Sequence, residues 1–329
     1  MNRSRSPLFA ILFFISSLGA FADVHAQSEA SRWPERPIRL VVPYPPGGAT
    51  DLLGRLFAVK LSSQLSQSVV VDNRGGATGG IGARTVAQSA PDGYTLLFTV
   101  GTDLALSRVL SGDSPVDPDR DLTAVIAAVQ SVTCIAASAS APVSSLEELV
   151  RYAKANPNRL SFGSPGIGSA PHLSGEMLRL NGIELLHVPF KGSGPTLDAL
   201  LAGRIDVAIA DVSSVLAAAK SGKVKILAMT HDRRYEGLPD VPSVSEALPG
   251  AAMPSGWYGL FGPAKMPRRI VAQLNNEMNA VLAAADVRPK IEEASFSVIG
   301  GSPQTLGDLA RRSVATYAWL VKAANIQPE

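Results

Sequence analysis

Short apolar runs alternate along the chain with glycine-rich loops and with segments whose apolar residues recur at helical spacing. In the first repeat, the β-branched run 38–44 leads through the loop 45–50 to residues 51–65, where the leucines and Phe57 recur at helical spacing. The pattern predicts strands at 38–44, 68–73, 94–100, 160–164, 184–190, 206–211 and 225–230. It predicts helices at 51–65, 81–90, 144–157, 172–182, 213–222, 267–285 and 304–323, with a further helix start at Pro195.

Alternating strands and helices predict an α/β fold with parallel sheets covered by helices on both faces. About 300 residues of this pattern exceed one ordinary open sheet, so we expect two doubly wound lobes. Since no long hydrophilic linker is present, the lobes are expected to be joined by crossing strands within 125–138 and 255–264. This arrangement predicts a discontinuous lobe 1 (27–130 plus 257–329) and a lobe 2 (131–256), with a hinge near Trp257 and Tyr258.

The first 26 residues have the pattern of a secretory signal peptide. Arg3 and Arg5 precede the apolar stretch 8–21, and the segment 24–26 ends in a small residue at the expected cleavage point. No cysteine follows the apolar stretch, so no lipid anchor is expected. An uncleaved anchor helix is the alternative, but the stretch is short for a membrane span. We therefore expect a soluble, periplasmic protein that begins at Gln27.

Composition narrows the function classes. The chain has 329 residues, a net charge of +2 and one cysteine, and 18% of its residues are charged. Removing residues 1–26 leaves 28 basic and 27 acidic side chains. No concentrated basic stripe is present, so nucleic-acid binding is not expected. A single cysteine excludes a disulfide framework and CxxC zinc sites, and Cys134, in an apolar run, is expected to be a buried hydrophobic residue.

The glycine loops are the strongest indication of a binding site. Several of them join the carboxyl end of a predicted strand to the beginning of a helix, which is where open α/β sheets bind ligands. The first N–H groups of a helix lack backbone partners and carry a partial positive charge. Loops of this kind facing one another would hold an anion without arginine or lysine. Any single loop of the set could equally be an ordinary turn.

Motifs for catalysis and for metal or nucleotide binding are weak or absent. The chain has no GxSxG, HExxH or Walker sequence, and its two glycine strings, 78–82 and 163–168, lack dinucleotide-binding spacing. No metal or cofactor is therefore expected. His187 lies on a predicted strand and is interpreted as a packed histidine. His172 follows Pro171 at a helix start, where ligand contact and a structural role are equally compatible with its position.

Five segments in order closely resemble the Bug family, the extracytoplasmic solute receptors of tripartite tricarboxylate transporters. They are IRLVVPYPPGGATDLLGRLFAVKL, VVVDNRGGATGGIGARTVAQSAPDGYTLLF, LSFGSPGIGSAPHLSGEML, HVPFKGSGPTLDALLAGRIDVAIAD and LPDVPSVSEALPG. The resemblance runs from about Trp33 to the C-terminus.

The resemblance implies a type II periplasmic binding protein fold, in which two α/β lobes close on a ligand. It implies a non-enzymatic receptor whose ligand is a small carboxylate: a di- or tricarboxylate, an acidic amino acid or an aromatic acid. The implied partners are the integral membrane permease subunits of a tripartite tricarboxylate transporter, and we expect a monomer. Signalling to a membrane two-component kinase is an alternative role that the sequence does not separate from transport.

The same resemblance places ligand-binding residues in both lobes. Those implied in lobe 1 are Tyr44, Gly48, Ala49, Thr50, Thr102 and Asp103, and those in lobe 2 are Gly168, Ser169, Ala170, His172, Gly192, Ser193 and Asp211. Asp51 is interpreted as a helix-capping or first-turn acid.

Two departures from the family pattern affect the ligand. An acid, Asp103, follows the Gly101-Thr102 pair, and Ala170-Pro171 replaces a position where hydroxyl residues are common. These changes argue against a densely charged ligand. Asp103 and Asp211 together suggest a ligand that also carries an ammonium or hydroxyl group, although Asp103 pointing to solvent is the simpler alternative. A less favoured alternative function is an exported α/β hydrolase or lyase that uses His172 and Asp211.

Overall fold

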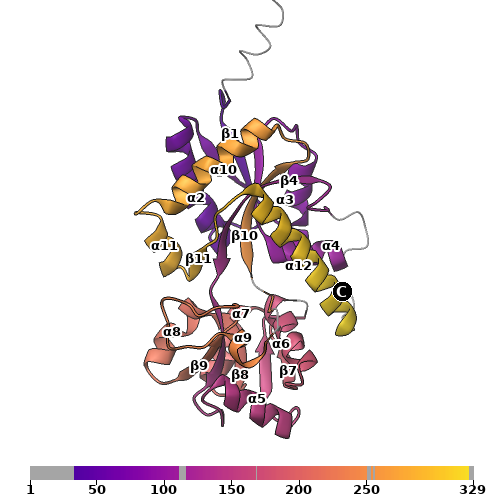
Figure 1. Cartoon of the computed structure of the whole chain (residues 1–329), viewed down its shortest axis with the longest axis vertical. Coiled ribbons are helices and arrows are strands. Elements are labelled where there is room, and N and C mark those ends of the chain that lie inside the picture. The colour runs from indigo at the N-terminus through magenta and orange to yellow at the C-terminus, as the bar shows by residue number, and fades with distance from the viewer. Residues whose placement is uncertain (1–32, 111–115, 168, 250–252, 255, 326–329) are drawn as a thin grey trace, which may run out of the picture.

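The computed structural model describes residues 33–110, 116–167, 169–249, 253–254 and 256–325, and it has two lobes (Figure 1). The signal-peptide segment 1–26 and Gly168 lie outside the described residues. Each lobe is built on one sheet. Lobe 1 contains the six-stranded sheet β11-β4-β10-β3-β1-β2, and lobe 2 contains the five-stranded sheet β7-β6-β8-β5-β9.

Lobe 1 combines elements from both ends of the chain, as the indigo and yellow ribbons of Figure 1 show. Its strands are β1 (Ile38–Val42), β2 (Val69–Asn73), β3 (Thr95–Val100), β4 (Leu122–Ser131), β10 (Trp257–Pro263) and β11 (Phe296–Val298). Its helices are α2 (Ala49–Leu65), the 3₁₀ turn η1 (Ala77–Gly79), α3 (Gly80–Ala87), α4 (Gly101–Leu110), α10 (Arg268–Ala283), α11 (Arg288–Glu293) and α12 (Pro303–Ala323).

Lobe 2 is formed by the middle of the chain. Its strands are β5 (Thr133–Ser138), β6 (Ser161–Ser164), β7 (Leu186–Pro189), β8 (Val207–Asp211) and β9 (Val224–Met229). Its helices are α5 (Leu146–Ala155), α6 (Ala170–Leu180), α7 (Ser193–Leu201), α8 (Val212–Lys220) and α9 (Val244–Ala247). In both lobes, helices cover the two faces of the sheet, and their apolar sides form separate cores on each face.

The fold class expected from the sequence is confirmed, but the expectation of purely parallel sheets is wrong. β1 pairs in parallel with β2 and β3, whereas β10 runs antiparallel to β3 and to β4. In lobe 2, β5 is likewise antiparallel to β8 and β9. β10 enters its sheet directly from lobe 2, and no crossover helix sets its direction as in a βαβ unit. This explains why alternation of elements predicted the layers and not the strand directions.

The lobes are connected where β4 leads into β5. β4 ends at Ser131 and β5 begins at Thr133, so one residue separates strands of the two sheets. The N–H of Ser131 donates to the carbonyl oxygen of Gly256, just before β10, at 2.7 Å. The two crossing segments therefore lie side by side. The lobe boundaries 27–130, 131–256 and 257–329 stay a prediction, as does the hinge at Trp257 and Tyr258.

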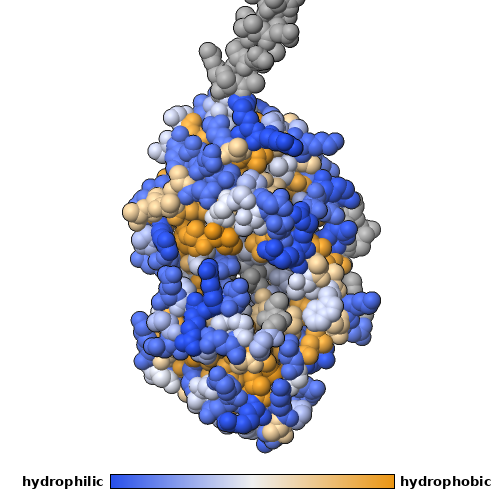
Figure 2. Space-filling view, viewed as in Figure 1, coloured by the Kyte–Doolittle hydropathy of each residue, from blue (hydrophilic) through white to orange (hydrophobic). Residues whose placement is uncertain are grey.

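A second contact between the lobes is apolar. Leu173 and Met177 of α6, in lobe 2, form one buried cluster with Leu106 of α4 and with Tyr317 and Leu320 of α12, in lobe 1. α12 contacts both α4 and α6. In Figure 2 the molecule narrows at the level where the lobes meet. Movement of one lobe relative to the other must therefore displace α6 against α12.

Candidate functional site

The loop after β1 and the first turn of α2 together carry four of the residues expected in the site. Gly48 is the N-cap residue of α2, with an extended backbone (φ −79°, ψ 169°) and no side-chain cap. Gly48 and Ala49 are exposed, whereas the side chain of Thr50 is buried. The first turn of a long helix thus presents its N–H groups at a loop without a bulky side chain.

Asp51 holds this loop in place. Its carboxylate accepts hydrogen bonds from the backbone N–H of Gly47 (2.9 Å), from Nε of Arg55 (2.9 Å) and from Nδ2 of Asn73 (2.9 Å). The bond from Arg55, together with those from Gly47 and Asn73, lowers the pKa of Asp51 to about 2. Asp51 lies in the first turn of α2, so its interpretation as a first-turn acid is confirmed.

Tyr44 and Asp103 contact each other inside lobe 1. The Tyr44 hydroxyl donates to Oδ2 of Asp103 at 2.8 Å, and the Thr102 side chain also hydrogen-bonds to this carboxylate. Burial raises the pKa of Asp103, and burial together with the Asp103 charge raises the pKa of Tyr44. The alternative in which Asp103 points to solvent is therefore wrong. The residues after β3 form a helix, α4, from Gly101 onward, which is absent from the helices that the sequence predicted.

The beginning of α6 contains the second group of expected residues. Ser169 caps this helix by accepting the N–H of His172 at 3.3 Å, and its hydroxyl donates to the carbonyl oxygen of Gly166 at 2.7 Å. Ala170 is the first helical residue, followed by Pro171. The helix thus begins where the sequence predicted it, within two residues.

His172 packs inside lobe 2. Its ring stacks on the ring of His187, with 4.4 Å between the centroids, and its Nε2 lies 3.9 Å from Glu176. His187 in turn shares a hydrogen bond of 2.7 Å between Nε2 and the hydroxyl of Ser164, which also accepts the N–H of Gly166. The two histidines therefore support the loop that ends at Ser169. This packing gives His172 a structural role, and ligand contact by His172 stays a prediction.

We expect acid to destabilise the protein through these histidines. Burial, and secondarily the charge of His172, lowers the pKa of His187 from 6.5 to about 4, and burial also lowers the pKa of His172. Since both pKa values lie below those of the unfolded chain, stability is complete above about pH 6.5 and falls as the pH drops toward 4. Urea unfolding between pH 7.5 and 4.5 measures the slope. His187→Gln keeps a hydrogen-bonding group near Ser164 and should reduce the dependence of the unfolding free energy on pH. An unchanged slope would contradict the attribution of this dependence to His187.

The loops before α7 and α8 supply the remaining expected residues. Gly192 is the N-cap residue of α7, and its φ of +106° is a conformation that favours glycine. Ser193 is the first residue of that helix and is exposed. Asp211 ends β8 and is the N-cap residue of α8, where its carbonyl oxygen accepts the Ser214 hydroxyl at 2.6 Å. The Asp211 carboxylate makes no capping bond, and the surrounding protein raises its pKa by displacing water.

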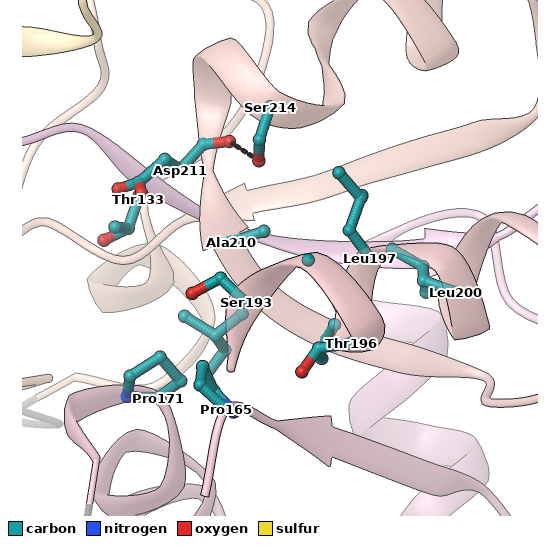
Figure 3. A pocket seen from close by; sticks show the side chains of 13 residues that line it. Thr133, Pro165, Pro171, Ser193, Thr196, Leu197, Leu200, Ala210, Asp211 and Ser214 are labelled. Atoms are coloured by element: carbon teal, nitrogen blue, oxygen red, sulfur yellow. Dashed lines mark hydrogen bonds between the residues drawn. The ribbon is translucent and has the colours of Figure 1, made fainter. Parts of the chain in front are cut away.

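A cavity of about 250 Å³ opens among these helix starts (Figure 3). Pro171 of α6, Ser193 and Gly194 of α7, and Asp211 and Ser214 at the start of α8 all line it. The rest of the lining consists of Thr133, Pro165, Thr196, Leu197, Leu200, Ala208, Ile209 and Ala210. Ser193 and Asp211 are thus the expected site residues that this cavity brings together.

The other expected residues that the structure describes lie outside the lining of this cavity. The lining does not include Ser169, Ala170, His172 or Gly192 of lobe 2, or the six lobe 1 residues. Thr133 and the leucines of α7 were missed by the sequence reasoning. Leu197 and Leu200 follow Ser193 at helical spacing, which has the appearance of an ordinary core stripe. Ligand contact by the thirteen residues stays a prediction.

Tyr258 lies at the crossing strands between the two lobes. It lies on β10, its side chain is buried, and its hydroxyl hydrogen-bonds to the side chain of Ser131. Burial raises the pKa of Tyr258 to about 12, and the charges of Asp211 and Asp103 add to this effect. Two carboxylates from different lobes therefore act on one hydroxyl beside the crossing strands. Cys134 lies nearby on β5 and is buried, as expected, with a pKa raised to about 12 mainly by burial.

Within the described part of the chain, no cluster of three or more His, Cys, Asp or Glu residues is arranged to hold a metal ion. Of the described helices, none is both long enough and apolar enough to cross a membrane. Two α/β lobes joined by adjacent crossing segments, with helix N-termini around a cavity, define the class of two-lobe solute-binding proteins.

Comparison with known proteins identifies the family. Residues 53–326 match the model of the tripartite tricarboxylate transporter family receptor, and the chain belongs to this family. A relative from Pseudomonas sp. (strain P51), described as a UPF0065 protein in the tcbD-tcbE intergenic region, is 37% identical over 309 residues, covering 92% of this chain and 91% of the relative. The family and its structural neighbours are solute-binding proteins without enzymatic activity, so the hydrolase or lyase alternative is not retained.

Solved structures of similar sequence share the fold. A ligand-free TctC solute-binding protein from Polaromonas is 29% identical, with a TM-score of 0.80, and the match covers 88% of this chain and 99% of that one. The R. palustris protein Rpa4515 with adipate is 34% identical, with a TM-score of 0.72 and coverages of 90% and 100%. MatC from Rhodopseudomonas palustris with bound malate is 30% identical, with a TM-score of 0.69 and coverages of 88% and 100%.

Proposed function

We propose that this protein is a periplasmic receptor that captures a small carboxylate between its lobes and delivers it to the permease of a tripartite tricarboxylate transporter. The observation that supports this most directly is the cavity on which the first turns of α6, α7 and α8 converge. Helix N-termini attract anions through free N–H groups and the helix dipole. The two relatives of known structure with adipate and with bound malate hold acids of this kind.

Lobe closure would complete the site. The exposed N-terminus of α2 supplies donors from lobe 1, and the start of α7 supplies them from lobe 2. A ligand that makes more contacts in the closed arrangement shifts the population toward it. Export through cleavage after Ala26 and a monomeric state belong to the same proposal.

A charge substitution at the start of α7 tests the anion site. A side chain at Gly194 meets no heavy atom within 4 Å of its Cβ, so both Gly194→Asp and Gly194→Asn fit without steric conflict. The two variants differ only in charge. We expect Gly194→Asp to weaken carboxylate binding roughly tenfold relative to Gly194→Asn, through repulsion at the helix N-terminus.

The measurement is a thermal-shift screen of mono-, di- and tricarboxylates, aromatic acids and acidic amino acids, followed by calorimetry of the best ligand. The ligand should be recovered chemically unchanged. Equal affinity of the two variants would show that the N-terminus of α7 does not bind the carboxylate. Chemical conversion of the ligand would overturn the receptor function. Uptake of the same acid by cells with and without the receptor tests delivery to the permease.

A further inference from the structure

The cavity of lobe 2 is polar on one side and apolar on the other. Thr133, Ser193 and Asp211 lie toward the start of α7, whereas Leu197 and Leu200 lie on the side away from Thr133 and Pro171 (Figure 3). Ser193, Leu197 and Leu200 are spaced four and three residues apart, so they share one face of α7. The cavity thus extends along the side of α7.

Two small residues of β8 leave this space open. Ala208 and Ala210 alternate with Val207 and Ile209, so the two alanines point to the face of the sheet that α7 covers. Val207 and Ile209 belong to the core on the opposite face, where larger side chains fill the interior. Ala208 is 1% exposed and packs in the core at the bottom of the cavity, so Ala210 is the position where a leucine or valine would occupy part of the open space. The cavity volume of about 250 Å³ compares with about 150 Å³ for an apolar cavity that accepts benzene.

The charges around the cavity determine which ligand fits. Asp211 is the one charged residue among the described residues that line it, and no lysine, arginine or histidine takes part. A carboxylate at the start of α7 meets backbone N–H groups. A second carboxylate on the same ligand, reaching further in, would meet either the Asp211 carboxylate or the leucines. Burying an unpaired charge in apolar surroundings is costly.

We infer that this cavity selects an acid with a single carboxylate and an apolar body, such as an aryl or alkyl monocarboxylate, over hydrophilic di- and tricarboxylates. The inference rests on the proposed receptor function and assigns its ligand class. The carboxylate lies at the start of α7, and the apolar body extends along α7 and over Ala210 toward Leu197, since Leu200 and Ala208 are buried at the bottom of the cavity. This ligand class differs from the adipate and malate held by the two relatives.

Matched ligands test the inference on the purified protein. Hexanoate and adipate have the same number of carbons and differ by one carboxylate, and phenylacetate provides an aryl monocarboxylate. We expect calorimetry to give hexanoate and phenylacetate at least about tenfold tighter binding than adipate. If no acid of any class binds, the receptor function itself fails. If adipate or citrate binds as tightly as hexanoate, the receptor function stands and this inference is overturned.

Two substitutions locate the selectivity. Ala210→Leu, which fills the cavity from β8, should weaken hexanoate and phenylacetate about tenfold or more. Asp211→Asn removes the negative charge at nearly constant shape. It should therefore reduce the ratio of the hexanoate affinity to the adipate affinity. Circular dichroism and ligand-free melting establish that each variant is folded. Should Ala210→Leu fail to fold, the Asp211→Asn comparison decides, and an unchanged hexanoate-to-adipate ratio there overturns the inference.

Discussion

Gly101→Ala is expected to destabilise the protein by about 2–4 kcal/mol, because the added methyl group has no space. A Cβ at Gly101 would lie 2.0–2.1 Å from three atoms of the Trp257 ring. The ring cannot move aside easily, since it is buried and its Nε1 donates to the Ser313 hydroxyl at 2.8 Å. Trp257 also lies on β10, which pairs with strands on both sides. The clash would push α4 away, together with Thr102 and Asp103.

Gly48→Ala is the matched control. Like Gly101, Gly48 follows a strand and stands at the start of a helix. A Cβ at Gly48 meets no heavy atom within 4 Å. The Gly48→Ala substitution should lower the free energy of unfolding by less than about 1 kcal/mol. Urea unfolding of both variants, followed by circular dichroism and tryptophan fluorescence, gives the two free energies. A loss at Gly101 no greater than at Gly48 would mean that the Trp257 ring adapts, contrary to expectation.

Tyr317→Ala is expected to cost about 3 kcal/mol and to loosen the contact between the lobes. Tyr317 is 2% exposed and belongs to the apolar cluster that joins α12 and α4 of lobe 1 to α6 of lobe 2. Removing the ring leaves a cavity where Leu173 and Met177 of α6 now pack. Because the cluster links two lobes, part of the loss should appear as lobe separation without unfolding.

Tyr317→Phe separates packing from hydrogen bonding in this test. It keeps the ring and removes the hydroxyl, so it should stay within about 1 kcal/mol of the parent protein. Small-angle X-ray scattering measures the radius of gyration of each variant without ligand. We expect a larger radius for Tyr317→Ala than for Tyr317→Phe. The same radius and the same melting temperature for both would show that the cluster does not restrain the lobes.

Much of the architecture could be predicted because its signals are local. Apolar periodicity located helices such as α2 and α12. Strand direction is not local information. β10 pairs with β3 and β4, and nothing within the sequence of β10 itself specifies its antiparallel orientation. The short elements α9, α11 and β11 have too few residues to establish a period.

The candidate site shows the same limit at the level of side chains. Ser193 and Asp211 could be predicted because the segments that contain them, FKGSG and DVAIAD, resemble those of the Bug family. Leu197 and Leu200 could not be separated from a core stripe, since only the alanines on β8 turn that stripe into the wall of a cavity. His172 begins a helix after a glycine loop, which is a position typical of ligand contact. Its stacking partner His187 lies 15 residues later on β7, so the local sequence does not reveal that the two rings pack together.

The strand order of lobe 1 also determines when this lobe can be completed during synthesis. β10 lies between β3 and β4 in the sheet, yet all the strands of lobe 2 separate it from them along the chain. β5 to β9 are contiguous, so lobe 2 can form as soon as it has been synthesised. Until β10 arrives, β3 and β4 lack their shared partner, and pairing over such sequence distances is slow. Chains that stop before Trp257 therefore expose unpaired strand edges, which is a geometry that favours aggregation.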